Sequence, residues 1–478
     1  MLLRDHKTKI VATIGPASDS QEMLERLIRA GLDVARLNFS HGEFEHHGEV
    51  IARIRTAEKK VGHSVAIMAD LPGPKMRLGK IEPEPIILKE GDAFTLTNEN
   101  LIGNNRRAST SFEPLPRVVK PGDRLFLNDG LVHLQVECVS GAQVQCKVVV
   151  GGELRSRKGL NLPGIKLGIH AFTEHDRRCL EFALCSGVDA VSQSFVESAD
   201  DIKQVRSTAL SMGKSPFIIA KIERADALAH YDEILESADG IMIARGDLGV
   251  EVPIEEIAII QKQLILKANI AGKPVITATQ MLESMVSNRL PTRAESTDVA
   301  NAILDGTDCV MLSGESAMGH FPEESIAMLA RIAATTETRR PFAWLDSFHD
   351  VAPKPSTAAQ AMGMVVKNAL ENVSCAAVFI PTRSGDTARM ISRFKPSAWI
   401  VAVGGDRSVL QGLRFSFGVD TVQVETDQEN WRDFANRWLQ DHQQKGTIAL
   451  LVAAASSRDP DANHRIEFMR VGGMPVCR

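Results

Sequence analysis

Eight short apolar segments, each typical of a buried strand, constrain the fold of this chain more than any other feature. They are Ile10–Ile14, Asp33–Phe39, Val65–Asp70, Ala190–Phe195, Phe217–Ile222, Gly240–Arg245, Pro274–Thr279 and Cys309–Leu312. The last five are each followed by a segment with helical spacing of apolar residues. Alternation of strand and helix predicts a parallel sheet, and eight such units favour a closed (β/α)₈ TIM barrel over an open sheet.

A helix is also expected after the first strand, because Leu24, Leu27 and Ile28 share one helical face. Residues 18–21 are suited to cap its start, and Gly31 is suited to end it.

The stretch between the third and fourth strands follows a different pattern. Residues 131–150 alternate between apolar and polar, with a turn expected at Ser140-Gly141. Val132, Leu134, Val136 and Cys138 are expected on one face of the first strand, and the turn is expected to lead into Val144, Cys146 and Val148. This pattern predicts a hairpin within a β-rich insertion. The insertion leaves the carboxyl end of a barrel strand, so it is expected to lie over the active face as a lid.

A boundary rich in proline, Pro341–Pro355, precedes a second alternation of helix and strand. The helix is expected at Ser356–Leu370, and the strands at Ala376–Ile380, Trp399–Val403, Thr421–Glu425 and Thr447–Ala453. We therefore expect a barrel of residues 1–72 and 169–345, a lid of residues 73–168 and a C-terminal open α/β domain of residues 346–478.

Composition excludes several classes of protein. The 55 Lys and Arg against 60 Asp and Glu give a net charge of −5, which argues against a protein that coats nucleic acid. Seven cysteines without a Cys-x-x-Cys pair argue against a disulfide scaffold or a structural zinc site. The start of the chain does not read as a signal peptide, and the apolar run Ile448–Ala455 is too short to cross a membrane. We expect a cytoplasmic protein without nucleic-acid or membrane partners.

Polar residues gather where the predicted barrel strands end, which is where barrel enzymes carry their chemistry. Lys221 and Glu223 have the same parity on one strand and so point to one side. They form either a salt bridge of the barrel core or a cation beside a carboxylate that binds metal. Asp247 supplies a second carboxylate, and two carboxylates with substrate oxygens suit Mg²⁺.

An anion is also expected at these strand ends. Gly246 and Gly249 flank Asp247 at a strand-to-helix turn, which either binds an anion through backbone N–H groups or is an ordinary barrel turn. Arg36 and Arg77 with Lys221 would form a cationic cluster suited to phosphate. Beside a metal, such a cluster favours phosphoryl transfer.

Longer motifs at these positions resemble the pyruvate kinase family over nearly the whole chain. They are Thr13–Ser18, Ala35–Gly42, Lys158–Gly164, Ala220–Glu223, Ala244–Glu251, Ala278–Met285, Pro291–Glu295 and Met311–Glu315. The resemblance implies a (β/α)₈ barrel, a β-barrel lid inserted after strand three and a C-terminal α/β domain. It also implies a homotetramer.

The activity implied by the resemblance is transfer of the phosphoryl group of phosphoenolpyruvate to ADP, which gives pyruvate and ATP as the last step of glycolysis. By similarity, Glu223 and Asp247 hold Mg²⁺, with Mn²⁺ as a substitute, and Lys221 and Arg36 bind the phosphoryl group. The amides of Gly246 and Asp247, with Thr279, would bind the carboxylate. Thr279 would also lie near the face where the enolate is protonated.

Further positions carry implied roles. Ser313 and Glu315 are candidates for substrate binding and a proton relay, and the nucleotide side comprises Pro16, Asn38, His41, Arg77 and Lys158.

The loop after strand three departs from the common family pattern. Lys75 stands where members that require K⁺ carry Glu, and members independent of K⁺ have Lys there. We expect the Lys75 ammonium to replace the monovalent cation, unless this lysine is only a solvated loop residue. Asn38, Ser40 and Asp70, which match K⁺ ligands, are then not needed as ligands.

Thr382, Arg383, Ser384, Gly385, Asp386 and Thr387 resemble the effector phosphate loop of the family. A phosphorylated allosteric effector is therefore expected, although Asp386 disfavours a bisphosphate. The simpler interpretation is a helix start capped by Ser384.

Two other functions compete with this interpretation. A Mg²⁺-dependent aldolase or lyase acting on a pyruvate enolate would use the same carboxylates, but it does not explain Lys221, Arg77 and Lys158 together. A non-catalytic relative that binds effectors would not need Lys221, Glu223 and Asp247, which are all present.

Overall fold

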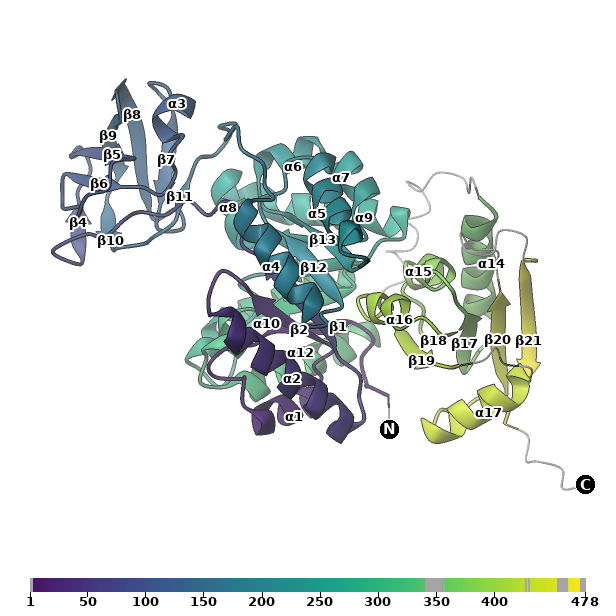
Figure 1. The fold of residues 1–478 in the computed structure, drawn as a ribbon. Coiled ribbons are helices and arrows are strands. Elements are labelled where there is room, and N and C mark those ends of the chain that lie inside the picture. Colours follow the sequence, from purple (N-terminus) through teal and green to yellow (C-terminus); the bar gives the residue numbers. More distant parts are fainter. Residues whose placement is uncertain are drawn as a thin grey trace, which may run out of the picture.

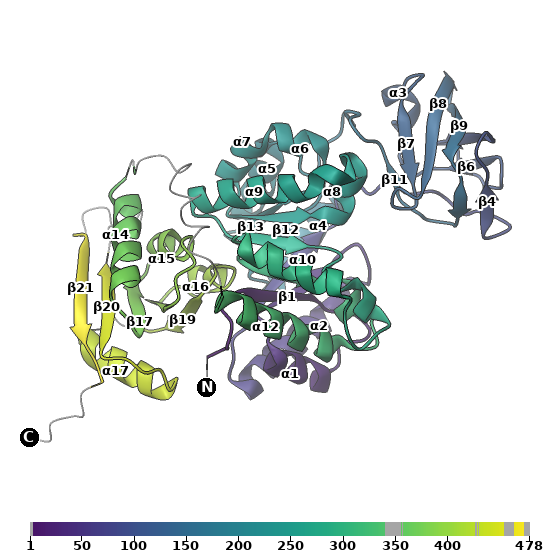
Figure 2. The same ribbon diagram turned by 180° about the vertical axis from the view of Figure 1, so that it is seen from behind.

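The computed structural model describes residues 3–339, 355, 357–425, 428, 430–453 and 463–472. In both views the barrel lies between two smaller parts, with the β-rich insertion at one end and the C-terminal sheet at the other (Figures 1 and 2). The expected boundary near residue 345 and the expected start of the first C-terminal helix at Ser356 lie outside the described residues. The other domain limits stay predictions.

All eight predicted barrel strands form, and they close into one parallel barrel. They are β1 (Lys9–Thr13), β2 (Val34–Asn38), β3 (Ala66–Leu71), β12 (Ala190–Gln193), β13 (Phe217–Ile222), β14 (Gly240–Ala244), β15 (Val275–Ala278) and β16 (Cys309–Leu312). Nearly every residue of these strands is buried, which explains why they appear in the sequence as continuous apolar runs. The parallel register pairs Asn38 with Asp70 and Asp70 with Ser192, so these polar residues lie abreast at the carboxyl ends.

Helices cover the outside of the barrel. They are α1 (Gln21–Ala30), α2 (Phe44–Val61), α4 (Glu174–Cys185), α5 (Ala199–Ser211), α6 (Ala225–Ala229), α7 (Tyr231–Ser237), α8 (Arg245–Glu251), α9 (Ile257–Ala271), α10 (Arg293–Leu304), α11 (Gly314–Ala317) and α12 (Pro322–Glu337). Two short 3₁₀ turns accompany them, η1 (Ile254–Glu256) and η2 (Glu283–Val286). The expected first helix is confirmed: the Ser20 side chain accepts from the Met23 N–H at the start of α1, and Gly31 ends it.

The insertion is β-rich, as predicted. It contains β4 (Ile86–Leu88), β5 (Ala93–Thr97), β6 (Arg107–Ser109), α3 (Leu115–Val118), β7 (Arg124–Leu127), β8 (Val132–Ser140), β9 (Gln143–Val150), β10 (Gly152–Leu154) and β11 (Leu160–Asn161). Six strands form one sheet, and β4 and β10 form another. The apolar residues between Met76 and Leu167 make a core separate from that of the barrel.

The predicted hairpin is the antiparallel pair of β8 and β9. The prediction that Cys138 shares a face with Val132, Leu134 and Val136 is wrong, because Cys138 is exposed whereas those three are buried. A register irregularity between Val136 and Cys138 shifts the alternation by one residue. Val139, rather than Cys138, then packs against the core of the insertion.

The C-terminal part is an open five-stranded sheet in the order β19–β18–β17–β20–β21. Its elements are α14 (Ala358–Asn372), β17 (Ala377–Pro381), α15 (Asp386–Ser392), β18 (Trp399–Gly404), α16 (Arg407–Leu413), β19 (Val419–Gln423), α17 (Trp431–Asp441), β20 (Ile448–Ala453) and β21 (Arg465–Arg470). Four strands are parallel, and the unpredicted β21 is antiparallel to β20.

Buried polar contacts join the C-terminal part to the amino-end face of the barrel. The Lys9 ammonium donates to the Val419 carbonyl at 2.8 Å, and the Lys395 ammonium lies 2.6 Å from an Asp308 carboxylate oxygen. Phe217 and Phe415 stack across the same boundary. The opposite, carboxyl-end face of the barrel is therefore left for the insertion and for the polar strand ends. Among the described residues, no helix has the length and apolar character needed to span a membrane.

Candidate active site

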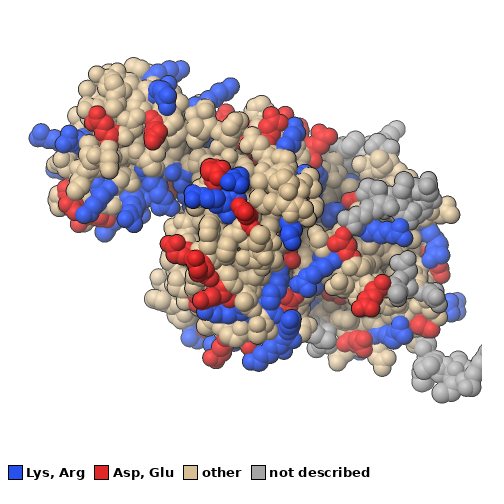
Figure 3. Space-filling view, viewed as in Figure 1, with Lys and Arg blue, Asp and Glu red and all other residues tan. Residues whose placement is uncertain are grey.

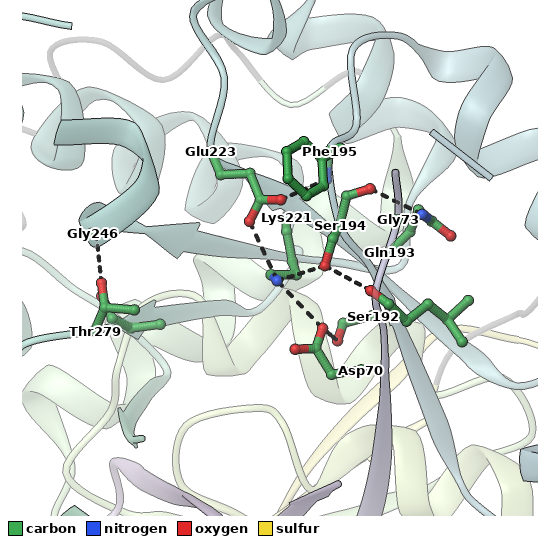
Figure 4. A network of polar contacts seen from close by, with 12 residues as sticks. Asp70, Gly73, Ser192, Gln193, Ser194, Phe195, Lys221, Glu223, Gly246 and Thr279 are labelled. Atoms are coloured by element: carbon green, nitrogen blue, oxygen red, sulfur yellow. Dashed lines mark hydrogen bonds and ion pairs between the residues drawn. The ribbon is translucent and has the colours of Figure 1, made fainter. Parts of the chain in front are cut away.

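A buried network of polar side chains lies at the carboxyl ends of β3, β12 and β13 (Figure 4). At its centre, the Lys221 ammonium donates to the Ser194 hydroxyl at 2.6 Å. The same nitrogen lies 3.3 Å from Oε2 of Glu223 and 3.5 Å from Oδ1 of Asp70. Burial acts to lower the pKa of Lys221, but Asp70 and Glu223 outweigh it and the pKa is raised. The cation is thus kept fully charged in a buried site.

Glu223 uses its two carboxylate oxygens differently. Oε1 accepts the Phe195 N–H at 2.6 Å, whereas Oε2 is buried and accepts no hydrogen bond. Burial raises the pKa of Glu223 to about 6, Lys221 opposes this rise, and the nearby Asp247 on α8 adds to it. A buried oxygen without a hydrogen bond, beside a second carboxylate, is suited to a divalent cation.

The backbone of Phe195 is left-handed, with φ at 59°. This conformation is unfavourable for a bulky residue and is typical of strained functional turns. It directs the Phe195 N–H toward Glu223 (Figure 4). Ser194 and Phe195 therefore hold Lys221 and Glu223, the two groups predicted at the reaction centre.

Arg36 on β2 is tied to the same network. Its guanidinium donates to Oδ2 of Asp70 from Nε at 3.1 Å and from Nη2 at 2.5 Å, and to the Thr13 hydroxyl at 2.7 Å. Burial acts to raise the pKa of Asp70, but Lys221 and Arg36 lower it well below its usual range. Asp70 is therefore an ionised anchor for two cations.

Thr279 closes the opposite side of the site. Its hydroxyl accepts the Gly246 N–H at 2.7 Å and donates to the Ala278 carbonyl at 2.6 Å. Its backbone φ of 67° is again left-handed. The contact joins the end of β15 to the first turn of α8, which carries Asp247.

Ser313 and Glu315 lie after β16. Both oxygens of the buried Glu315 carboxylate accept backbone N–H groups, from Leu282 at 3.1 Å and from Ser313 at 2.8 Å. This pattern joins the loops after β15 and β16. It makes Glu315 a positioning group in this structure, and its participation in a relay stays a prediction.

Arg77, one of the residues expected on the nucleotide side, lies close enough to His41 for its charge to act on the imidazole. Burial lowers the pKa of His41, followed by the charges of Lys75, Arg77 and Arg36. Pro16 is exposed in the loop after β1.

Lys158 belongs to the insertion, where its backbone carbonyl accepts the Leu78 N–H at 2.9 Å. Within the described chain, the Lys158 side chain makes no hydrogen bond or ion pair, so the structure does not join it to the Lys221 network.

Lys75 lies in the loop after β3 and its side chain is exposed. The surrounding protein still lowers its pKa by desolvation, and Lys221 lowers it further, whereas Asp70 and Glu223 act to raise it. The Lys75 charge therefore interacts electrostatically with the Asp70 and Glu223 carboxylates. Asn38 Oδ1 accepts the Ser40 N–H at 3.1 Å, and Asp70 is already paired with two cations.

The loop between β17 and α15 is satisfied by its own side chains. The Ser384 hydroxyl donates to Asp386 at 2.7 Å, and the Gly385 N–H donates to the Thr382 hydroxyl at 2.9 Å. Arg389 pairs with Asp386 at 3.0 Å. The Ser384 hydroxyl also accepts the Asp386 N–H at 3.4 Å, but the N-cap residue of α15 is Gly385, and no side chain caps the helix.

Ser192, Ser194 and Asp176 were not predicted as parts of the site. The Ser192 hydroxyl donates to Asp70 at 2.6 Å, and an Asp176 oxygen accepts the Gly73 N–H at 2.9 Å. Ser192 and Ser194 are two residues apart at the end of a predicted strand, so their side chains point to the same side. This spacing could have identified them from the sequence. Asp176 follows a helix cap, and no sequence pattern connects it to Gly73.

Comparison with known proteins agrees with the architecture. Residues 5–326 match the family model described as pyruvate kinase, barrel domain, and residues 360–461 match pyruvate kinase, alpha/beta domain. A pyruvate kinase of Thermococcus litoralis is 50% identical over 426 residues, which is 88% of this chain and 89% of the relative. One of Geobacillus stearothermophilus is 44% identical, over 87% of this chain and 72% of the relative.

A solved structure agrees as well. The crystal structure of a pyruvate kinase from Cryptosporidium parvum superposes with a TM-score of 0.90 at 36% identity, covering 98% of this chain and 96% of that one. The matches span the barrel and the C-terminal domain, and the identity is high over most of both partners. The chain therefore belongs to the pyruvate kinase family, whose members are phosphotransferases.

Proposed function

We propose that this chain transfers the phosphoryl group of phosphoenolpyruvate to ADP at the Lys221 network, without needing K⁺. The observation that carries the proposal is the buried Lys221 ammonium between Glu223 and Asp70. A substrate with a carboxylate and a phosphoryl group requires positive charge at a fixed point, and a buried lysine whose pKa is raised supplies it.

The residues present fit a magnesium ion. Glu223 Oε2 is buried without a hydrogen bond, and the Asp247 charge acts on Glu223. Among the described residues, no three His, Cys, Asp or Glu side chains gather to hold a metal, so substrate and water oxygens would complete the shell. Glu223 and Asp247 would hold Mg²⁺ or Mn²⁺. When bound, the ion would neutralise charge on the substrate oxygens.

The protein groups then have separate tasks. Lys221 binds the phosphoryl group in transit and stabilises the enolate oxygen that forms when its bond to phosphorus breaks. Arg36 binds the phosphoryl oxygens while a β-phosphate oxygen of ADP forms the new bond. The Gly246 and Asp247 amides with Thr279 orient the carboxylate, so that the enolate carbon presents one face for protonation.

Protonation of the enolate carbon gives pyruvate and completes the reaction. Thr279, whose hydroxyl accepts the Gly246 N–H, would lie near the face that is protonated, and Ser313 and Glu315 would serve as relay residues. Pro16, Asn38, His41, Arg77 and Lys158 would bind ADP, the last by approach of the insertion. Closure would exclude water from the phosphoryl group.

Lys75 would take the part of the monovalent cation. Its charge is felt by Asp70 and Glu223, next to the proposed phosphoryl site. Asn38, Ser40 and Asp70 would then not act as K⁺ ligands. A tethered ammonium is always present at high effective concentration, so added K⁺ would contribute little.

The test is pyruvate formation from phosphoenolpyruvate and ADP with Mg²⁺, first without Na⁺ and K⁺ and then with K⁺. Equal rates would support both parts of the proposal. Activity only with K⁺ would support the kinase activity and refute the proposed role of Lys75. Pyruvate released without ADP, or no reaction from folded protein, would refute the kinase in favour of a lyase or a binding protein.

Two further expectations from the family are proposals of the same kind. A phosphorylated effector would act through the C-terminal domain, and four chains would associate. Large apolar side chains exposed on the barrel support association, and they are Ile254, Ile259, Leu290 and Met318. Light scattering on the purified chain measures the mass: four chains would support the proposal, and one chain would refute it.

A further inference from the structure

Arg224 directly follows the proposed metal ligand Glu223, at the end of β13, and its side chain is 2% exposed. It is the most deeply buried arginine of the described chain. Its three nitrogens lie against carboxylates from three separate segments. Nε lies 3.0 Å from Glu197 in the loop after β12, Nη1 lies 3.9 Å from Glu251 at the end of α8, and Nη2 lies 3.4 Å from Asp226 in α6. The guanidinium is therefore held in one orientation.

The same guanidinium also holds the insertion. Nη2 donates to the Ile165 carbonyl at 3.1 Å, and the Ile165 side chain belongs to the apolar core of the insertion. Ile165 lies in the segment that leads back to the barrel, residues 162–168, which we call the return segment. Arg224 therefore joins the barrel to the insertion through a buried hydrogen bond.

The return segment contains two glycines with left-handed backbone, Gly164 with φ at 68° and Gly168 with φ at 66°. A Cβ added at either of them would meet no described atom within 4 Å, so packing does not require glycine there. Glycine permits these turns at low cost and also permits others. The segment can therefore change direction on both sides of Ile165, and the bond from Arg224 fixes a direction that the glycines leave open.

Lys158, the residue of the insertion proposed to bind ADP, is coupled to the return segment, because only β11 lies between them in the chain. The next carbonyl, that of Gly159, accepts the Asn128 N–H at 3.1 Å. The turn that contains Asn128 lies against α8, where a Cβ added at Gly130 would be 3.5 Å from both Cγ atoms of Val250.

The figures show the same arrangement. Both ribbon views place β11 on the side of the insertion that faces α8 (Figures 1 and 2). Figure 3 shows lysine and arginine side chains along the edge where the insertion meets the barrel. A shift of the return segment would therefore move Lys158 and its neighbours relative to the polar strand ends.

We propose that Arg224 is a positioning residue for nucleotide binding. It fixes the return segment against the barrel and so sets where Lys158 lies relative to the Lys221 network. This inference rests on the proposed function, because it concerns the ADP of that reaction. The position requires an arginine: a lysine carries its charge on a single nitrogen and could not reach the three carboxylates and the carbonyl together.

Steady-state kinetics of Arg224→Lys and Arg224→Gln tests the proposal. Both variants lose the bond to the Ile165 carbonyl, so we expect the KM for ADP to rise about tenfold, as for one lost charged hydrogen bond. The KM for phosphoenolpyruvate should change less than twofold, because its proposed ligands belong to the barrel. Arg177→Gln, which removes an exposed arginine from α4, is the control and should alter neither constant.

Two kinetic outcomes would overturn the proposal. An unchanged KM for ADP in both variants would show that Arg224 does not act on the nucleotide. An equal rise of both KM values would show that Arg224 supports Glu223 instead of the insertion. Arg224→Lys keeps a positive charge among the three carboxylates, so it is the variant to use if Arg224→Gln fails to fold.

Hydrogen exchange of the ligand-free proteins, measured by mass spectrometry, needs no turnover. Peptides from the return segment should exchange at least threefold faster in Arg224→Lys than in the parent, because local opening becomes easier. Peptides from β8 and β9, within the insertion, should exchange at the parental rate. Parental exchange of the return segment would overturn the inference even in an active enzyme, whereas faster exchange in an inactive protein would refute only the proposed activity.

Discussion

The Lys221 ammonium is held by oxygens that come from three different strand ends. They belong to Ser194, Glu223 and Asp70, at 2.6, 3.3 and 3.5 Å. Only the serine is neutral, so it positions the ammonium through a hydrogen bond without forming an ion pair. Its hydroxyl donates in turn to the Leu71 carbonyl at 2.7 Å, which sets the direction of its lone pairs.

Ser194→Ala should lower kcat for pyruvate formation by about tenfold, with a smaller change in KM for phosphoenolpyruvate. Loss of a charged hydrogen bond leaves the ammonium less well placed for the phosphoryl group in transit. Steady-state kinetics measures both constants. Ser211→Ala, an exposed serine at the end of α5, is the control. A kcat within twofold of the parent would show that Ser194 does not position Lys221.

Lys75→Glu should make the enzyme depend on K⁺. The variant replaces the tethered cation by a carboxylate in reach of Asp70, so activity in K⁺-free buffer should fall by roughly a hundredfold, an order-of-magnitude expectation for one lost charge. Added K⁺ should restore part of it. Lys89→Glu makes the same charge change on the exposed surface of the insertion and should not alter the K⁺ response. Full activity of Lys75→Glu without K⁺ would contradict the prediction.

Among secondary-structure elements, α4 links helix capping to the active site. At its start, Oδ2 of the buried Asp176 accepts the Thr173 N–H at 2.8 Å and forms a capping box. Its other oxygen accepts the Gly73 N–H at 2.9 Å. Gly73 has a φ of 64° and packs so closely on Phe195 that an added Cβ would lie 2.8 Å from its ring. One carboxylate thus holds a helix and the loop that supports the strained turn.

Asp176→Ala should lower the free energy of unfolding by about 2 kcal/mol, because it leaves buried N–H groups without acceptors. Urea denaturation measures the change. Glu174→Ala removes an exposed carboxylate from the same helical turn and should leave the stability almost unchanged, as is usual for exposed sites. Equal stability of the two variants would show that the Asp176 contacts contribute little.

Regular elements were predictable where a single physical rule determined them. The barrel strands are buried on both faces and appear as apolar runs, and all eight were found. The shorter strands β4, β6, β10 and β11 have two or three residues, which is too few for any periodicity. The edge strand β21 has a mostly exposed, polar pattern and was missed for a related reason.

The site was predictable to the level of strand ends, and the contacts within it were not. The alternation of side chains along a strand predicted that Lys221 and Glu223 point to one side. Lys221 Nζ and Glu223 Oε2 lie 3.3 Å apart. The contacts of Ser194 and Asp176 depend on register between distant segments, which one sequence does not reveal.

At the scale of the whole molecule, buried histidines predict how stability changes with pH. His6 lies near the boundary of the barrel and the C-terminal domain, and its Nδ1 contacts the Thr8 carbonyl at 2.8 Å. Burial lowers the pKa of His6, and burial likewise lowers that of His63. The unfolded chain therefore binds protons first as pH falls below about 6.5, so the stabilising contribution is present above that pH and is lost below it.

We expect the melting temperature to fall between pH 7.5 and pH 5.5, and to fall less in His6→Asn. Asparagine keeps a donor for the Thr8 carbonyl and does not titrate in this range. His230→Asn, at an exposed position between α6 and α7, should keep the parental pH dependence. A parental dependence in His6→Asn would rule out His6 as a source. Calorimetric scans at both pH values make the comparison.

The insertion has a core of its own. Two connecting segments join it to the barrel, one after β3 and one before α4. Few apolar contacts would therefore be lost if the insertion moved relative to the barrel. The insertion is therefore a structural module separate from the barrel. A shorter loop in its place would leave the barrel strands intact and the reaction centre open to water, so that hydrolysis would compete with transfer to a nucleotide.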